Sequence, residues 1–477
     1  MIDRREVMDF SNEFGLAPNV VEKDYVLGWL LAGIANQPEL GPSWVFKGGT
    51  CIKKCFFETY RFSEDLDFTL TTADHLEQDF LKRSFAGVTQ WIYENSGIEI
   101  PEDTIRFDVY TNPRGKVSVQ GKIGYRGPLQ PRGDLPRIKL DLTNDEVLVL
   151  APVSREVHHP YSDNPEDGIS VQCYSFEEVF AEKLRALAER ERPRDLYDVI
   201  HLYRHEELKA NREQIMKTLE QKCAFKGIAV PTMQSLENRP ERAELVSEWE
   251  NMLGHQLPML PPFEQFWNEL PAVFAWLHGE APQAVTSAAM SVTGEVDTTW
   301  QPPSMGHAWH APVPLEIVRF AAANRLCVEL GYNGSRRLIE PYSLRRTKDG
   351  NLLLAAVKHE TGESRSYRVD RIESAEPSNV SFIPRYVIEL TPAAPIFAPP
   401  TKRTARVPHT PKARNPFSFS RSTGRTRKGI GPTYVIQCPL CQKKFNRSSY
   451  DTALNPHKNS MGYPCSGRTG YIVETKY

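Results

Sequence analysis

The sequence predicts an α+β protein of several domains, and three observations support this prediction. Its 477 residues exceed what one ordinary hydrophobic core requires. Apolar residues recur at helical spacing in segments such as 21–31, whereas segments such as 65–70 alternate polar and apolar residues as strands do. The composition, with 40% hydrophobic and 25% charged residues, is that of a globular protein.

Neither a membrane span nor a secretion signal is expected. No run of about 18 apolar residues occurs in the sequence. Residues 1–6, Met-Ile-Asp-Arg-Arg-Glu, lack the apolar core of a signal peptide. We therefore expect a cytoplasmic protein with no membrane partner, whose eight cysteines are thiols or metal ligands rather than disulfides.

A glycine turn that leads into a helix is the first candidate binding site. Residues 44–46 predict a short buried strand, and residues 51–60 predict a helix. Backbone N–H groups at such a turn can bind phosphate, and glycine lets the backbone approach it closely. The turn consists of Lys47, Gly48, Gly49 and Thr50. Many Gly-Gly-Thr turns bind nothing, so the turn needs support from elsewhere.

Two aspartates on the following strand give that support. Asp65 and Asp67 alternate with apolar residues, so both carboxylates point to one side of the strand. Two such like charges favour a bound cation, and oxygen ligands suit Mg²⁺ or Mn²⁺. The alternative is the exposed polar face of an edge strand. A later alternating strand, residues 137–143, carries Asp141, which is either a third carboxylate of this site or part of an ordinary polar face.

Two later helices supply further candidates. Ser175 and Glu178 form a capping-box pattern at the start of an amphipathic helix that contains Lys183. Pro193 ends this segment, and the next helix begins with Asp195. Lys183 would contact phosphate, and Asp195 would line the site or anchor a basic side chain. The alternative for both is charge on a solvated surface.

Taken together, these segments resemble the AbiEii/MenT-type nucleotidyltransferase toxin family, whose fold is DNA-polymerase-β-like. The match spans roughly residues 15–205, and the run Arg-Phe-Ser-Glu-Asp-Leu-Asp-Phe at 61–68 is its most specific part. The other matching segments are 22–25, 47–50, 181–184 and 194–198.

The resemblance implies roles for individual side chains. The nucleotide-binding residues would be Lys47, Gly48, Gly49, Thr50 and Lys183. The catalytic residues would be Asp65, Asp67, Asp141, Lys183 and Asp195. Among these, Asp65 and Asp67 would bind Mg²⁺ or Mn²⁺.

The expected activity is transfer of a nucleoside monophosphate from an NTP to an acceptor, either an RNA such as a tRNA end or a protein. Metal ions held by carboxylates assist in-line attack on the α-phosphate, and a third carboxylate could accept the proton of the attacking hydroxyl. The family implies a toxin or anti-phage effector controlled by a cognate antitoxin. A different class stays open: a nucleic-acid- or nucleotide-responsive regulator in which the transferase fold is a non-catalytic scaffold.

The second half of the chain predicts a helical tail, a linker and a small β-barrel. Residues 313–390 combine a helix with strands that are separated by Asn-Gly and Asp-Gly turns, which are hairpin signals. These residues resemble a WYL domain, a small SH3-like barrel, in segments 331–334, 339–344 and 367–372. Asn-Leu-Leu-Leu at 351–354 stands where Trp-Tyr-Leu would be expected. Arg368 and Arg371 are either contacts for a nucleotide or nucleic acid, or simple surface arginines.

The C-terminal segment predicts a zinc-binding module. Cys438 and Cys441 form a Cys-x₂-Cys pair, and His457 and Cys465 follow after fifteen and seven residues. This pattern suits tetrahedral Zn²⁺. A redox-active Cys-x₂-Cys is the rival interpretation, but the segment is too short for the fold that such motifs occupy.

Charge is distributed unevenly along the chain. Residues 396–477 hold 15 Lys or Arg residues against 2 acids, whereas residues 1–395 hold 43 against 58. A basic tail on an acidic body indicates a polyanionic partner; the alternative is a solvated linker beside a small module. The family resemblance implies RNA in preference to DNA as the nucleic-acid partner. The expected divisions are 1–280 for the transferase with its helical tail, 281–312 for a linker, 313–395 for the WYL-like domain, 396–432 for a basic linker and 433–477 for the zinc module.

Overall fold

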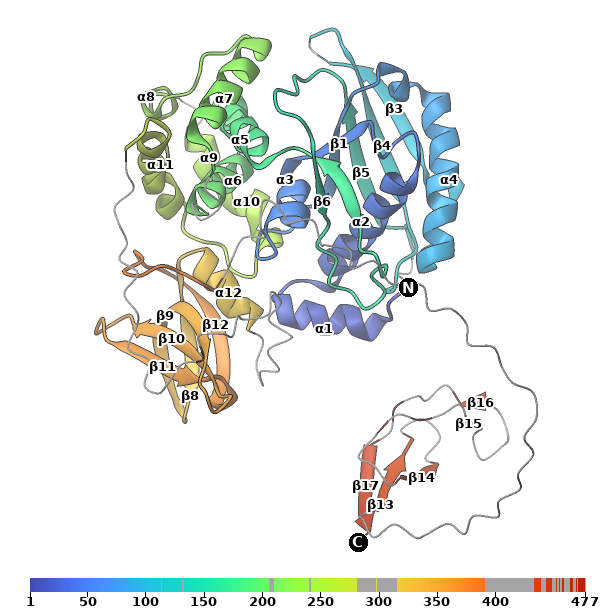
Figure 1. Cartoon of the computed structure of the whole chain (residues 1–477), viewed down its shortest axis with the longest axis vertical. Helices are drawn as coiled ribbons and strands as arrows, with labels where there is room; N and C mark the ends of the chain where they lie inside the picture. The colour runs from blue at the N-terminus through green and yellow to red at the C-terminus, as the bar shows by residue number, and fades with distance from the viewer. Residues whose placement is uncertain are drawn as a thin grey trace, which may run out of the picture. The chain divides into compact units, whose positions relative to one another are not determined.

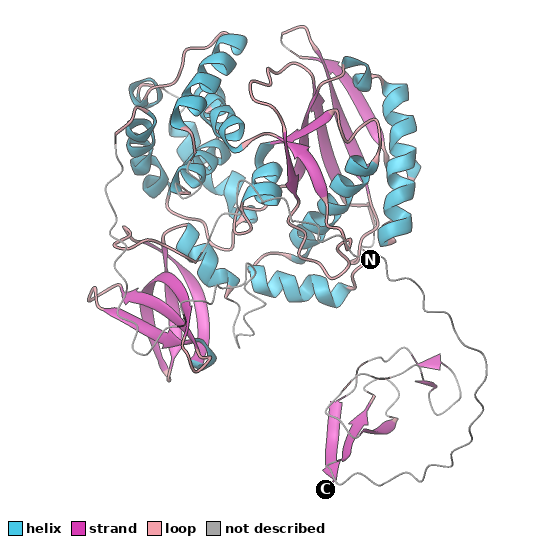
Figure 2. Cartoon of the chain, viewed as in Figure 1, coloured by secondary structure: helices cyan, strands magenta, loops and turns pink. Residues whose placement is uncertain are grey.

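The computed structural model describes residues 1–112, 114–130, 133–205, 210–239, 242–280, 297 and 315–390, and short stretches between 433 and 476. The chain forms two compact units, Met1–Pro400 and Thr401–Tyr477. The first unit contains a mixed seven-stranded sheet with helices, followed by a smaller β-rich part (Figures 1 and 2). The mixed α+β class expected from the sequence is therefore confirmed.

The large sheet has the strand order β3-β4-β5-β2-β1-β7-β6, which puts β2 at its centre. Pairs β2–β5 and β1–β7 are parallel, and the other pairs are antiparallel. The strands are β1 (Trp44–Lys47), β2 (Asp65–Leu70), β3 (Arg106–Thr111), β4 (Val117–Gly124), β5 (Arg137–Thr143), β6 (Val153–Glu156) and β7 (Ser170–Cys173).

Helix α4 (Gln78–Ser96) packs on one face of this sheet. Phe85 of α4 lies against Phe107 of β3 and Trp44 of β1, with ring centroids 5.0 and 6.2 Å apart. Helix α2 (Pro18–Asn36) is buried along most of its length because its apolar residues surround the whole helix, and α1 (Arg4–Phe14) precedes it.

A helical part follows the sheet in the chain. Its helices are α5 (Phe176–Arg190), α6 (Pro193–Arg204), α7 (Arg212–Lys226), α8 (Met233–Glu237), α9 (Arg242–Ser247), α10 (Trp249–Leu253) and α11 (Phe263–Leu277). As the capping pattern predicts, the Ser175 side chain accepts a hydrogen bond from the Glu178 N–H at the start of α5.

The predicted helix over 51–60 differs in the structure. A short helix α3 (Gly48–Cys51) passes into a π-helix, Ile52–Phe56, after which the chain becomes extended. The Phe57 N–H bonds to the Ile52 carbonyl, which completes the i to i+5 pattern. In the extended segment that follows, the side chains of Tyr60 and Arg61 both bond to Asp198 of α6.

The smaller β-rich part begins with α12 (Glu316–Ala323) and forms an antiparallel sheet of order β11-β10-β9-β8-β12. The strands are β8 (Leu326–Tyr332), β9 (Ser335–Arg346), β10 (Leu352–Lys358), β11 (Ser364–Arg368) and β12 (Ile372–Ser381). The Asn-Gly turn predicted at 333–334 joins β8 to β9, with φ of 51° and 71° at its two residues.

The C-terminal unit contains short strands among its described residues. β14 (Lys444–Arg447), β13 (Thr433–Gln437) and β17 (Tyr471–Lys476) form one sheet, and β15 (His457–Lys458) pairs with β16 (Pro464–Cys465). The basic segment 396–432 lies outside the described residues, as does the linker 281–312 except Asp297. The seven cysteines that the structure describes are all free of disulfides. Within the described residues, no helix is long and apolar enough to cross a membrane.

A buried arginine joins α12 to the segment that precedes β2 of the large sheet. Arg319 is 2% exposed and bonds to Glu316 on its own helix, to the Leu390 carbonyl at 3.1 Å and to Glu58 at 3.4 Å. Nearby, the Tyr197 hydroxyl of α6 donates to Asn324 Oδ1 at 2.9 Å. The WYL-like part is therefore packed directly against the segment that leads into β2.

We expect Arg319→Ala to destabilise the chain by about 3 kcal/mol, because it leaves the Glu316 and Glu58 carboxylates without their buried cation. Scanning fluorimetry should show a Tm several degrees lower. The matched control is Arg336→Ala, whose side chain is 71% exposed and forms only a surface pair with Glu329; its effect should stay below about 0.5 kcal/mol. Equal Tm values for the two variants would contradict the role of Arg319.

Candidate active site

The strand register brings the three predicted carboxylates to one face of the sheet. Asp67 of β2 is paired with Asp141 of the parallel strand β5 and with Lys47 of the antiparallel strand β1. Asp65 lies two residues earlier on β2 and is paired with Lys139. Because paired residues share a face and i, i+2 residues do too, Asp65, Asp67 and Asp141 point to the same side.

Crowding of these carboxylates changes their proton affinity. Burial raises the pKa of Asp67 to about 6, and the Asp141 and Asp65 carboxylates add to this effect against the opposing influence of Lys47. Burial also raises the pKa of Asp65, with Asp141 again adding to it and Lys139 opposing it. The Gln120 amide donates to Asp141 Oδ1 at 3.3 Å. Carboxylates are the type of ligand that Mg²⁺ or Mn²⁺ takes, but the ligand atoms of these three do not all lie within 4.8 Å of one another in this structure.

The glycine turn fits tightly between an acid and an arginine. Gly48 has φ of 81°, and a Cβ there would lie 2.2 Å from Asp67 Oδ2. A Cβ on Gly49 would lie 2.4 Å from Arg61 Nη2. The Thr50 hydroxyl donates to the Asp65 carbonyl. The turn therefore has room for glycine only, and Thr50 ties it to β2.

A buried ion network holds this turn against the helices. Arg61 donates to Asp198 through Nε at 2.7 Å and Nη2 at 2.8 Å. Lys183 Nζ of α5 lies 2.7 Å from Asp198 and 3.4 Å from Asp195, and Arg190 Nε lies 2.7 Å from Asp195. Burial alone would raise the pKa of Asp198, but Arg61 and Lys183 hold it well below its ordinary value.

A cavity of about 630 Å³ lies over this face of the sheet, with acids and bases on its walls. Of the residues predicted from the sequence, those that line it are Lys47, Gly48, Asp67, Asp141 and Lys183. Gly49, Thr50, Asp65 and Asp195 lie next to these residues but do not line the cavity. Asp195 is fully buried between Lys183 and Arg190, so its contact with the cavity is indirect.

The cavity also contains residues that sequence reasoning did not select. Its basic wall includes Arg185, Arg190, Arg192 and Lys226, and its rim includes Tyr110 of β3. Among the described residues, Arg192 forms no ion pair, whereas Arg185 is held by Glu182 at 2.6 Å. The segment Arg-Glu-Arg-Pro at 190–193, between Lys183 and Asp195, is the sequence signal that could have identified two of them.

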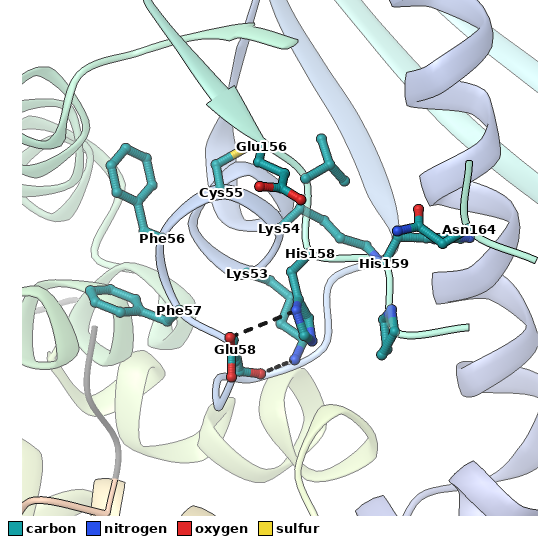
Figure 3. A pocket seen from close by; sticks show the side chains of 12 residues that line it. Lys53, Lys54, Cys55, Phe56, Phe57, Glu58, Glu156, His158, His159 and Asn164 are labelled. Atoms are coloured by element: carbon teal, nitrogen blue, oxygen red, sulfur yellow. Dashed lines mark hydrogen bonds and ion pairs between the residues drawn. The ribbon is translucent and has the colours of Figure 1, made fainter. Parts of the chain in front are cut away.

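A second cavity, of about 370 Å³, is lined by the π-helix and by residues 156–160 (Figure 3). Lys53 donates to the Glu58 carbonyl there, and burial lowers the pKa of Lys53 to about 8. His158 Nδ1 faces a Glu58 carboxylate oxygen at 4.0 Å. None of the predicted site residues lines this cavity, so it is separate from the cavity beside Asp67.

The other predicted contacts lie outside the transferase part. Arg368 is paired with Asp370 at 2.7 Å on the surface of the WYL-like sheet, and Arg371 is exposed in the adjoining 3₁₀ turn. In the C-terminal unit, the ligand atoms of Cys438, His457 and Cys465 lie within 4.8 Å of one another, as a metal site requires. Cys441 lies outside the described residues.

Residues 29–271 match the family described as the nucleotidyl transferase AbiEii toxin of type IV toxin–antitoxin systems, and the chain belongs to this family. Residues 314–377 match the WYL domain. Both resemblances found in the sequence are thereby confirmed, and the enzyme class is nucleotidyltransferase.

Solved structures match the chain at low identity and low TM-score. MenT4, a nucleotidyltransferase toxin from Mycobacterium tuberculosis, is 16% identical with a TM-score of 0.39, over 59% of this chain and 91% of that chain. JHP933 from Helicobacter pylori is 17% identical with a TM-score of 0.35, over 55% of this chain and 93% of that chain. No curated protein sequence matches the chain. The family assignment therefore rests on the family model rather than on these structures.

We expect Asp67→Asn to stabilise the metal-free protein at pH 7.5, with an unfolding free energy higher by on the order of 1 kcal/mol and a correspondingly higher Tm. The folded state holds the Asp67 proton more tightly than the unfolded chain, with a pKa of about 6 against 3.8. The wild-type penalty is thus absent below about pH 4, grows as the pH rises from about 4 to about 6, and is constant above that. Fluorimetry in chelator across this range should show the variant's advantage shrinking toward pH 4.

The matched control is Asp103→Asn, an exposed carboxylate in a short 3₁₀ helix, which should leave the Tm unchanged at every pH. Addition of Mg²⁺ at pH 7.5 should stabilise the wild type more than Asp67→Asn. If Asp67→Asn is no more stable than the wild type at pH 7.5 in chelator, then burial of the ionised Asp67 carboxylate does not destabilise the folded protein.

Proposed function

We propose that the protein is a metal-dependent nucleotidyltransferase toxin that transfers a nucleoside monophosphate from an NTP to an acceptor. The observation that carries this proposal is the pairing of Asp67 with Asp141 on adjacent strands, opposite a wall that contains Lys183 and Arg192. Carboxylates that bind metal and cations that bind phosphate thus meet across one cavity of triphosphate size. An RNA such as a tRNA end is the preferred acceptor, and a protein is the other.

The carboxylates divide the chemistry between them. Asp65 and Asp67 would hold Mg²⁺ or Mn²⁺, which supplies charge neutralisation at the α-phosphate. Asp141, held by Gln120, would accept the proton of the attacking hydroxyl. Metal binding by Asp67 needs its carboxylate deprotonated, so at limiting Mg²⁺ activity should decline as the pH falls through about 6, where Asp67 takes up a proton.

The basic residues would bind the triphosphate. Lys183 and Arg190 present their cations to the cavity while Asp195 and Asp198 anchor them from behind. Asp195 would therefore be a positioning residue that acts through Lys183. Lys47 and the Gly48 backbone lie at the opposite wall, beside Asp67.

The remaining domains would direct the reaction. We assign the transferase with its helical tail to 1–280, the WYL-like domain to 313–395 and the zinc module to 433–477, joined by linkers at 281–312 and 396–432. Arg368 and Arg371 would contact a nucleotide or nucleic acid, and the basic tail would bind RNA. Within a cytoplasmic toxin–antitoxin pair, a cognate antitoxin would restrain the enzyme, with phage defence as one use.

Transfer is tested with each α-labelled NTP, Mg²⁺ and total RNA. We expect label on RNA or protein with the wild type, and at least about 100-fold less with Asp67→Asn or Lys183→Met, because each loses a group that stabilises transition-state charge. Asp103→Asn is the matched control and should retain full activity. Absence of label with every NTP, together with tight nucleic-acid binding, would favour a regulator with a non-catalytic scaffold.

Zinc is tested by elemental analysis of the full chain. We expect about one equivalent of Zn²⁺ in the wild type and a loss of most of it in Cys438→Ser or Cys465→Ser, whose Sγ atoms lie 3.8 Å apart. Cys223→Ser is the matched control, since Cys223 is buried in α7, far along the chain from this unit. Less than about half an equivalent in the wild type would contradict the zinc assignment.

A further inference from the structure

The strand register forms rows of side chains that cross the sheet on the catalytic face. The row through Asp67 runs Asp108, Gln120, Asp141, Asp67 and Lys47. The next row, two residues earlier on β2, runs Arg106 of β3, Lys122 of β4, Lys139 of β5 and Asp65. Three consecutive cations thus lead across neighbouring strands to one predicted metal ligand.

This basic row lies on the other side of the carboxylates from the nucleotide cavity. The cavity is lined by Asp67, Asp141 and by residues from later in β5, such as Thr143. Neither Asp65 nor any cation of the row lines it. The carboxylates therefore lie between the proposed triphosphate cavity and the basic strip. In-line attack requires the second substrate to approach the α-phosphate from a different side than the rest of the triphosphate.

The strip is accessible to a ligand. Arg106 and Lys139 are exposed, and so is Arg137, which lies two residues before Lys139 on the same face. Within the described chain, these three form no ion pair, whereas Lys122 is partly neutralised by Asp108 at 3.0 Å. Helix α4 packs on the opposite face through Phe107, so it does not cover the strip.

We propose that this strip, formed by Arg106, Lys122, Arg137 and Lys139, binds the sugar–phosphate backbone of a single-stranded polynucleotide whose end is the acceptor. Strand spacing puts Arg106 roughly 14 Å from Asp65, three strands away, so the strip can follow a few nucleotides of backbone. Cations on an open sheet face next to acids would attract phosphates and leave the terminal hydroxyl beside Asp65. The inference rests on the proposed transfer, because it assigns the acceptor of that reaction.

The test uses the full-length chain with Arg106→Glu/Lys139→Glu, and with Lys82→Glu/Arg83→Glu as matched control. Lys82 and Arg83 are exposed on α4, which covers the other face of the sheet. Both double variants replace two cations by two carboxylates, so they change the net charge equally and differ only in location. Fluorescence anisotropy measures binding of a labelled single-stranded RNA of about 12 nucleotides over a range of salt concentrations. The basic tail is present in every variant, so differences between variants report on the sheet.

For the strip variant we expect the slope of log K for RNA binding against log salt concentration to decrease in magnitude by about 1.4. Two phosphate contacts are lost, and each contributes about 0.7 to the slope on a single strand. Its KM for RNA should rise roughly tenfold or more while its KM for NTP stays within about twofold. The control pair should match the wild type in all three values. DNA of the same sequence, run in parallel, should show the same loss in the strip variant if the contacts are to phosphate alone, and a smaller loss if they include the 2′-hydroxyl.

Identical slopes and KM values for the strip variant and the control would overturn the assignment, even if the wild type transfers nucleotides. Conversely, if the wild type shows no transfer with any NTP, the proposed function fails while anisotropy still decides whether the strip binds RNA. The two failures are therefore distinguishable.

Discussion

The buried pair between Arg61 and Asp198 is the interaction on which the catalytic region depends. Arg61 follows the glycine turn and packs against Gly49, and Asp198 lies on α6, 137 residues away in the chain. Asp198 also forms an ion pair with Lys183, so one carboxylate holds both Arg61 beside the turn and a lysine that lines the cavity. Removing one partner of such a pair leaves an uncompensated buried charge, an effect of about 3–5 kcal/mol. The sheet and the helical part are thereby held at a fixed separation across the cavity.

Because Asp198 holds the helices against the sheet, the cavity has a basic wall from the helices and an acidic wall from the sheet. Lys183 and Arg190 face the cavity because Asp195 and Asp198 hold them from behind. Asp67 and Asp141 face it from the sheet. On the other side of the carboxylates, the arginine and lysine strip gives a second substrate its own approach. The WYL-like part contacts the segment that leads into β2 through the pair between Arg319 and Glu58, which lies at the second cavity rather than at the carboxylates.

The features that the sequence predicted best depend on local spacing. Alternation placed Asp65 and Asp67 on one face, and the Asn-Gly turn and the Ser175 N-cap occur where their patterns indicated. The Glu178 side chain does not complete the capping box, because it accepts from the Val149 and Leu150 N–H groups instead. The neighbour relation of Asp67 and Asp141 depends on a parallel register that no local pattern encodes. No local pattern in the sequence indicated the π-helix, and the end of the expected helix at Tyr60 is held by Asp198 of a distant helix. The basic strip was missed for a similar reason, since its members are on three strands whose register is visible only in the folded sheet.

Asp198→Asn shows whether the Asp198 ion network organises the proposed nucleotide site. Calorimetry measures the affinity of this variant for a non-hydrolysable NTP analogue in the presence of Mg²⁺. Circular dichroism establishes that the variant is folded. We expect the Kd of the variant to be at least roughly tenfold larger than that of the wild type, because Lys183 and the glycine turn lose their common anchor. A folded Asp198→Asn protein that binds the analogue as tightly as the wild type would contradict this role of Asp198.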